Sequence, residues 1–189
     1  MDSTICAARD VTSQEWESLR VLYVQAFVAM SASLSACDLA LMGNNPQQFW
    51  AGVFDRDEPL SKAKNYTLSM SKDSGRIVAY GLYTYVSDEQ YLYIHHFVVH
   101  PDYQGQGFGK RLMHAIQELY VDTQKIGLLT RTYNVQAQNF YKRLGFSASV
   151  DVPSSVCEYY SSDRVYMERD CSCSNQLPSR IGLPAPVSQ

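Results

Sequence analysis

The sequence YLYIHHFVVHPDYQGQGFGKR, residues 91–111, joins an apolar run to a glycine-rich turn and the start of an amphipathic helix. From Tyr91 to Val99, apolar residues occupy both alternating faces, which is typical of a strand buried on both sides of a sheet. Pro101 ends this strand, and a helix is expected from about Gly109 to Val121. A strand, a glycine turn and a helix start in this order favour an anion-binding site, because the first N–H groups of a helix have no partner within it.

The glycine turn fits neither of two familiar phosphate-binding motifs. A Walker loop needs Gly where Gln104 stands and Ser or Thr where Arg111 stands, and a dinucleotide fingerprint needs its third Gly one residue after Gly109. The spacing that fits is Gln-x-x-Gly-x-Gly, which resembles the acetyl-CoA loop of the Gcn5-related N-acetyltransferase (GNAT) superfamily. A glycine-rich turn that merely starts a helix is the structural alternative.

A second motif, NVQAQNFYKRLGF at residues 134–146, lies about thirty residues further along the chain. Asn134 suits a helix cap and Gly145 suits a helix stop. The string resembles the second signature helix of the same superfamily. Together with the order of the strands, the resemblance covers roughly residues 5–168.

The rest of the chain predicts a mixed sheet with helices on both faces. A capping-box pattern at Thr12 starts a first helix, and Pro46 marks the start of another. Residues 31–42 either continue the first helix or form a loop, and residues 55–64 are expected to be a polar loop. The expected strands are residues 5–8, 66–70, 77–86, 91–99, 126–132, 146–150 and 164–168. The fold class is therefore α/β, and the resemblance implies the GNAT fold, with a central, mostly antiparallel and splayed sheet.

Length and composition predict one domain. The 189 residues, 46% of them hydrophobic, suffice for one buried core over residues 1–170, and residues 171–189, with three of the seven prolines, are expected to be a disordered tail. A net charge of -3 lacks the basic excess of a nucleic-acid binder. With no long apolar run and no leader pattern, a cytoplasmic protein without a membrane partner is expected. The five scattered cysteines predict neither a disulfide scaffold nor a bound metal.

The resemblance implies that acetyl-CoA binds as a co-substrate along the central strand and the glycine turn. Main-chain groups of Phe97, Val98 and Val99 would pair with the pantetheine arm, and Asn134 would contact the same arm. The diphosphate would lie on the amides of Gln104, Gly105, Gln106, Gly107, Phe108, Gly109 and Lys110. In this fold the strand that carries Phe97 splays from the next strand, and the thioester lies in the wedge between them, beside the amine.

Acetyl transfer to an amine needs a base and an acid. An alkylamine resembles Lys, whose pKa is about 10.4, so it arrives protonated and must lose a proton before it attacks. His95 and His96 are expected to point to opposite faces of their strand, and His95 matches in register the catalytic histidine of arylalkylamine acetyltransferases. The family match puts the Tyr141 hydroxyl near the sulfur, as the acid for the leaving thiolate. Core packing is the alternative for both residues, and Tyr93 stands where some protein-acetylating relatives carry a glutamate base.

The acceptor amine is the part that the sequence determines least. The nearest resemblance is to small-amine acetyltransferases, which act on diamines or arylalkylamines, but the diamine enzymes carry adjacent acidic residues where this chain has His95 and His96. The expected function is acetyl transfer from acetyl-CoA to a primary amine, a small molecule, by direct attack in a ternary complex. Protein N-terminal or lysine acetylation and a noncatalytic acyl-CoA-binding module are the alternatives, and a homodimer stays open as the assembly state.

Overall fold

The computed structural model describes residues 2–64, 66–154, 156–157 and 161–171, so the expected tail lies outside this part of the chain except for Cys171. The helices are α1 (Ser13–Ser31), α2 (Ala36–Leu41), α3 (Pro46–Ala63), α4 (Phe108–Leu119) and α5 (Val135–Arg143). The strands are β1 (Asp2–Ala7), β2 (Thr67–Asp73), β3 (Arg76–Val86), β4 (Tyr91–Val99), β5 (Lys125–Arg131), β6 (Ser147–Ala148) and β7 (Arg164–Asp170). Among the helices described, none is both long and apolar enough to span a bilayer.

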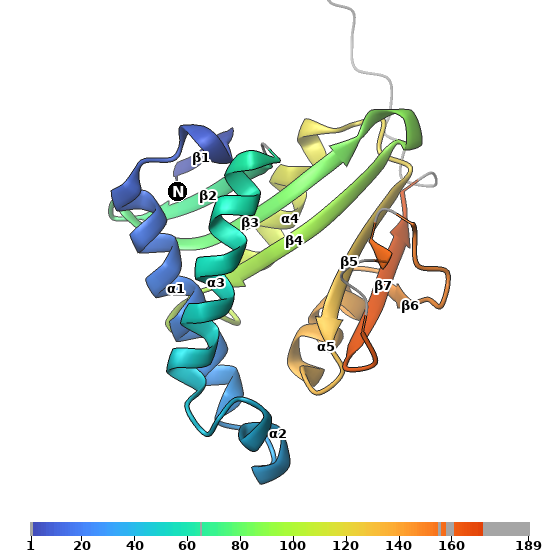
Figure 1. Cartoon of the computed structure of the whole chain (residues 1–189). Coiled ribbons are helices and arrows are strands. Elements are labelled where there is room, and N and C mark those ends of the chain that lie inside the picture. Colours follow the sequence, from blue (N-terminus) through green and yellow to red (C-terminus); the bar gives the residue numbers. More distant parts are fainter. Residues whose placement is uncertain (1, 65, 155, 158–160, 172–189) are drawn as a thin grey trace, which may run out of the picture.

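One seven-stranded sheet organises the chain, in the order β1-β2-β3-β4-β5-β7-β6. β4 and β5 run parallel, and the other neighbouring strands pair antiparallel. α1 and α3 cover one face of the sheet, and α4 lies behind it (Figure 1). This arrangement confirms the expected mixed, mostly antiparallel sheet with helices on both faces.

Side-chain caps start the two long helices where the sequence predicts them. The Oγ1 of Thr12 accepts the N–H of Glu15 at 3.2 Å, and the Glu15 carboxylate accepts the N–H of Thr12 at 3.2 Å, which completes the capping box of α1. The Oδ1 of Asn45 accepts the N–H of Gln48 at 3.0 Å at the start of α3. Each cap satisfies an N–H that the helix itself leaves without a partner.

Residues 55–63 correct one expectation, because they continue α3 and are not a polar loop. On this half of the helix, polar Asp57 contacts the sheet and Ser61 is buried, so the apolar periodicity ends after Phe54. The hydroxyl of Ser61 donates to the carbonyl of Asp57 at 2.6 Å, one turn earlier. Packing of α3 against α1 maintains the helix through Pro59, which the sequence pattern alone did not predict.

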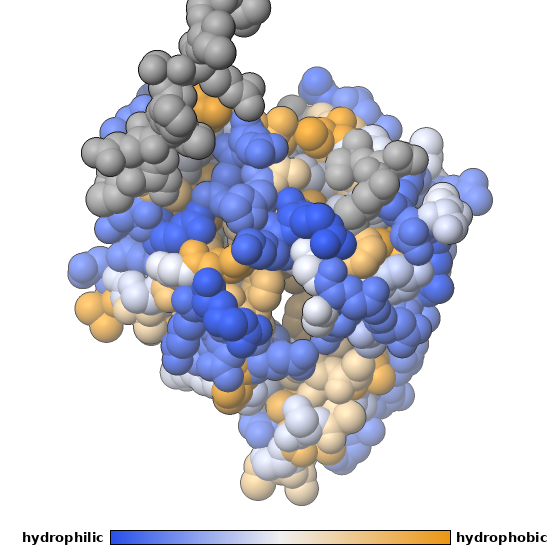
Figure 2. Space-filling view, turned by 180° about the vertical axis from the view of Figure 1, so that it is seen from behind, coloured by the Kyte–Doolittle hydropathy of each residue, from blue (hydrophilic) through white to orange (hydrophobic). Residues whose placement is uncertain are grey.

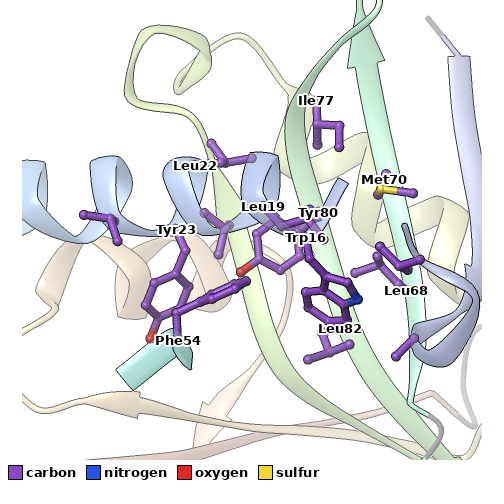
Figure 3. Close-up of a cluster of buried hydrophobic side chains, with 14 of the residues drawn as sticks. Trp16, Leu19, Leu22, Tyr23, Phe54, Leu68, Met70, Ile77, Tyr80 and Leu82 are labelled. Atoms are coloured by element: carbon purple, nitrogen blue, oxygen red, sulfur yellow. The ribbon is translucent and has the colours of Figure 1, made fainter. Parts of the chain in front are cut away.

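The two larger apolar cores of the described residues lie on the two faces of the sheet. The core between the sheet and the α1–α3 pair includes Trp16, Leu19, Leu22, Tyr23, Phe54, Leu68, Met70, Ile77, Tyr80 and Leu82 (Figure 3). The core beneath α4 and α5 includes Leu92, Ile94, Leu112, Met113, Ile116 and Tyr141. β4 supplies Val98 to the first core and Ile94 to the second, so it is buried on both faces as predicted.

A β-bulge in β4 corrects the expected orientation of the two histidines. Adjacent residues of β3 pair with Ile94 and His96, so that His95 has no counterpart in the ladder. The extra residue shifts the alternation of side chains by one position. His96 packs on the ring of Tyr23 from α1, and His95 stacks on Tyr66, a member of the same core, at 4.0 Å between ring centroids. Both histidines therefore lie on the α1–α3 side of the sheet.

β4 and β5 pair only along their first halves. The parallel ladder joins Tyr91–Ile94 to Lys125–Leu128. Beyond Ile94, β4 continues to Val99 along β3 alone, and the two strands diverge (Figure 1). The divergence leaves one edge of β4 without a neighbouring strand, as the expected splay requires.

Gly127 closes the narrow end of this wedge. It pairs with Tyr93, and the hydroxyls of Tyr91 and Tyr166 lie beside it, 3.1 Å from each other. A Cβ on Gly127 would lie 2.1 Å from the hydroxyl oxygen of Tyr91 and 2.6 Å from that of Tyr166. Because no side chain fits there, glycine allows β4 and β7 to be linked across β5.

The structure shortens one expected strand and settles one alternative that the sequence left open. The strand expected at residues 146–150 is reduced to the two residues of β6, because Phe146 packs into the core and Val150 is exposed to solvent. For residues 31–42 the sequence allowed a continued helix or a loop, and the structure shows a separate short helix, α2, whose first turn is capped by Ser35.

Candidate active site

A groove of about 700 Å³ lies between α1, the unpaired edge of β4 and α5. Its lining contains most of the predicted site residues: Phe97, Val98, Val99, Gln104, Gly105, Gly107, Phe108, Gly109, Lys110, Asn134 and Tyr141. Gln106 and His95 are not part of this lining, and α1 adds Phe27 and Met30, which neither motif indicated. Seen from behind, the molecule is hollowed near its middle, with hydrophobic and hydrophilic side chains around the hollow (Figure 2).

The glycine turn presents free amides at the start of α4. Gly105 and Gly107 have φ values of +74° and +81°, a region that other residues rarely adopt. The first intrahelical bond runs from the N–H of Arg111 to the carbonyl of Gly107, at 3.0 Å. The N–H groups of residues 108–110 therefore precede the intrahelical ladder, at the positive end of the helix dipole. This geometry suits an anion such as a diphosphate.

Hydrogen bonding of β4 shows which main-chain groups face the groove. The N–H of His100 donates to Val78 in β3, at 2.8 Å. Since alternate residues of an antiparallel strand bond to the same neighbour, Val98 faces β3, whereas Phe97 and Val99 point their N–H and C=O groups toward the wedge. Of the three predicted contacts, two are therefore oriented to pair with an extended ligand.

Glutamine side chains connect the strand, the turn and α5. The amide of Gln104 donates to the carbonyl of Val99 at 3.1 Å and accepts from Gln136 at 3.0 Å. The Oδ1 of Asn134 accepts the N–H of Ala137 at 3.1 Å, so this side chain caps α5 while it lines the groove. The first Gln of the motif thus fixes the turn against α5.

Tyr141 lies in α5 at the inner end of the groove, where 6% of its surface is exposed. Its ring packs against Phe97 and Phe140, with centroid distances of 6.3 Å and 5.2 Å. Burial raises the pKa of its hydroxyl, which therefore stays protonated at neutral pH. A protonated hydroxyl in this position is able to donate a proton or a hydrogen bond.

His95 lies on the other side of β4 from this tyrosine. Its ring stacks on Tyr66, contacts Tyr93 edge-on at 4.6 Å, and bonds through Nε2 to Thr84 Oγ1 at 3.2 Å. Burial first, and then the charges of His96 and Lys64, lower its pKa to about 3. His95 is therefore neutral at physiological pH and packed among aromatic rings.

A polar chain that the sequence analysis missed lies next to the bulge. The Nε2 of His96 is 3.1 Å from Asp57 Oδ2, and its Nδ1 is 3.3 Å from the Tyr80 hydroxyl. The sequence did not indicate Asp57 as a site residue, because residues 55–64 were expected to form a loop. A helical reading would have put Asp57 on the same face as Phe54 and Trp50, where a carboxylate is unexpected.

Charges from the other arm of the wedge face the same region. Arg131, at the end of β5, forms an ion pair with Asp163 and lies over the ring of Trp50, 6.0 Å from its centroid.

Over the residues that the structure describes, no group of three or more His, Cys, Asp or Glu side chains is placed to hold a metal ion.

Comparison with known proteins identifies the fold and the family. The model of the Acetyltransferase (GNAT) family matches residues 23–146. The chain is similar to the uncharacterized N-acetyltransferase ycf52 of Gracilaria tenuistipitata var. liui, with 48% identity over 56 residues, 29% of each protein. It is also 27% identical over 122 residues to the UPF0157 protein YqkA of Bacillus subtilis, which covers 59% of this chain and 35% of that protein. The matches thus span only about a third of the length of these curated relatives.

Among solved structures, the PaiA N-acetyltransferase of Thermoplasma acidophilum, in complex with coenzyme A, superimposes with a TM-score of 0.63. The superposition covers 90% of this chain and 99% of that one, at 11% identity, so it supports the fold alone. The family model covers well over half of the chain and includes the β4 edge, the glycine turn and α5. The chain therefore belongs to the acetyltransferase (GNAT) family.

Proposed function

We propose that this protein transfers an acetyl group from acetyl-CoA to a primary amine, a small molecule, by direct attack in a ternary complex. The observation that supports this most is the unpaired edge of β4, which continues into the free amides of the glycine turn. A linear ligand with a diphosphate at one end and an amide-containing arm matches these two features in their order. Coenzyme A has this build.

The residues present fit such a ligand. The main chains of Phe97 and Val99 are oriented to bond the amides of a pantetheine arm, and residues 108–110 offer N–H groups to a diphosphate. Lys110 and Arg111 add positive charge at the turn, where Arg111 lies over the Phe108 ring, 4.6 Å from its centroid. When bound there, acetyl-CoA supplies the thioester carbonyl that an amine attacks.

Tyr141 is the proposed acid for the leaving thiolate. It lies in the groove beside Phe97, and its raised pKa keeps the hydroxyl protonated at neutral pH, so that it can donate a hydrogen bond to the thiolate as the negative charge forms. Asn134 caps the helix that carries this tyrosine and thereby helps to fix its position.

Acetyl-CoA should stabilise the fold, because it binds the folded chain and not the unfolded one. At a hundredfold excess over the dissociation constant, linkage predicts about 2.7 kcal/mol, visible as a thermal shift. Gly107→Val should abolish this shift, since its side chain would enter the turn, where an added Cβ alone would lie 2.9 Å from the Arg111 Nη1.

The matched control for this substitution is Gly75→Val. Gly75 has the same φ of +81°, but it lies in the β2–β3 turn with no atom within 4 Å of a Cβ. Both variants should lose stability from backbone strain, and only Gly107→Val should lose the ligand shift. Equal thermal shifts by acetyl-CoA in the two variants would show that the glycine turn is not part of the binding site.

Replacing Tyr141 by Phe removes one hydroxyl and keeps the ring packing. If Tyr141 protonates the thiolate, turnover should fall by about a hundredfold or more, while the dissociation constant of acetyl-CoA stays near the wild-type value. Thiol release and calorimetric binding measure the two quantities. Tyr83→Phe, which removes a buried hydroxyl bonded to Ser69 at 2.8 Å, serves as control and should leave turnover unchanged. Wild-type turnover in Tyr141→Phe would show that Tyr141 contributes only packing and does not protonate the thiolate.

His95 is the base that the family resemblance implies, and His95→Gln tests this role. The pKa of His95 is about 3 in the folded protein and near 6.5 in the unfolded chain. Between these pH values, therefore, only the unfolded chain binds a proton at this residue. The free energy of unfolding should therefore fall as pH drops from about 6.5 toward 3, by up to about 1.4 kcal/mol per pH unit, and His95→Gln should reduce this slope. Because His95 stays deprotonated above pH 5, the variant should keep the wild-type pH profile of activity. Loss of an activity limb near pH 6.5 in the variant would instead assign the base to His95.

A further inference from the structure

Three elements contribute to the polar chain Tyr80–His96–Asp57, which lies on the α1–α3 side of β4. Tyr80 in β3 is fully buried, the His96 side chain is 10% exposed, and the Asp57 side chain on α3 is 40% exposed. Exposure thus increases along the chain, so the carboxylate is the end that a ligand reaches.

Hydrogen bonds hold the His96 ring between Asp57 and Tyr80. A carboxylate only accepts hydrogen bonds, so the Nε2 of His96 carries the hydrogen that Asp57 Oδ2 accepts at 3.1 Å. The Nδ1 of His96 lies 3.3 Å from the Tyr80 hydroxyl, which can donate a hydrogen bond to this nitrogen or accept one from it. Both nitrogens of His96 are engaged within the protein, and His96 therefore positions Asp57.

The bulge at His95 sets where this carboxylate lies relative to the groove. His96 faces α1 and α3, while the next residue, Phe97, faces the other side and packs against Tyr141. The Asp57 carboxylate and the Tyr141 hydroxyl thus approach the same short piece of β4 from its two faces. The thioester end of a ligand lying along Phe97 would be between them.

The surroundings of Asp57 are aromatic, and one of the two nearby arginines is paired with another carboxylate. Tyr23 of α1 lies beside it: burial mainly, and the charge of Asp57 in second place, raise the pKa of this tyrosine. The charges of Arg131 in β5 and Arg164 in β7 act on the same tyrosine in the opposite direction, and Arg131 is paired with Asp163. A bound cation could pair with Asp57, a carboxylate whose nearest described partner is a histidine.

We infer that Asp57, positioned by His96 and Tyr80, is the acidic residue that binds the ammonium group of the acceptor, so that the preferred substrates are cationic primary amines. This inference rests on the proposed function and adds the group that recognises the substrate. It also replaces, by a residue of α3, the adjacent acids that diamine acetyltransferases carry in the strand.

The test is calorimetric binding of two amines, 2-phenylethylamine and 1,4-diaminobutane, and of their alcohols, 2-phenylethanol and 1,4-butanediol, to the protein saturated with coenzyme A. Wild type should bind each amine at least about tenfold more tightly than its alcohol, since a hydrogen bond to a charged group contributes about 1.5–3 kcal/mol. Asp57→Asn should remove this difference without changing the binding of the alcohols. His96→Phe, which keeps a ring and removes both hydrogen bonds, should reduce the difference by a smaller factor.

Asp55→Asn is the matched control. Asp55 precedes Asp57 by two residues on α3, but it is paired with Arg20 at 2.6 Å, so the same charge change occurs away from the wedge. This variant should bind amines as wild type does. A wild type that binds neither amine better than its alcohol, or an Asp57→Asn variant that keeps the difference, would overturn the inference.

Thiol release with acetyl-CoA separates this inference from the proposed function. Charge-dependent binding without any thiol release would contradict acetyl transfer and leave the amine site standing. Equal release by wild type and Asp57→Asn would support acetyl transfer and contradict the amine site.

Discussion

The limited pairing of β4 with β5 is the constraint on which the site depends. The two strands share a ladder only from Tyr91 to Ile94, and the bulge at His95 follows immediately. Had the ladder continued, the N–H and C=O groups of Phe97 and Val99 would have been used by β5. Because it stops, these groups face a groove, and a strand in the middle of the sheet has an edge that no neighbouring described strand pairs with, where only the Val99 carbonyl already accepts from Gln104.

The paired halves of β4 and β5 have to be stably packed so that the two strands can stay apart beyond Ile94. Gly127 allows the Tyr91 and Tyr166 hydroxyls to meet across β5, and two apolar cores fix β4 from both faces. The bulge then puts two polar residues in succession on the α1–α3 side and returns Phe97 to the α5 side. This short segment of strand thereby has Tyr141, the proposed proton donor, on one side and the Asp57 carboxylate on the other.

Local signals in the sequence predicted much of this architecture. The capping box at Thr12, the cap at Asn134 and the positive-φ glycines act within a few residues, so their patterns can be read directly. The bulge was not predictable, since it depends on how β3 pairs with β4, and the side-chain alternation assumed for His95 and His96 was therefore wrong. The second half of α3 was missed because its inward face carries Asp57 and Ser61, and these polar residues are where the candidate amine site lies.

The proposed arrangement, with acetyl-CoA along the edge of β4 and the amine at Asp57, requires both substrates to be bound before any bond is made. Initial velocities measured over a grid of acetyl-CoA and amine concentrations test this requirement most directly. Direct transfer in a ternary complex predicts double-reciprocal lines that intersect, at every fixed concentration of the second substrate. Parallel lines, together with an acetylated protein isolated in the absence of amine, would show that the acetyl group passes through an enzyme residue and would contradict it.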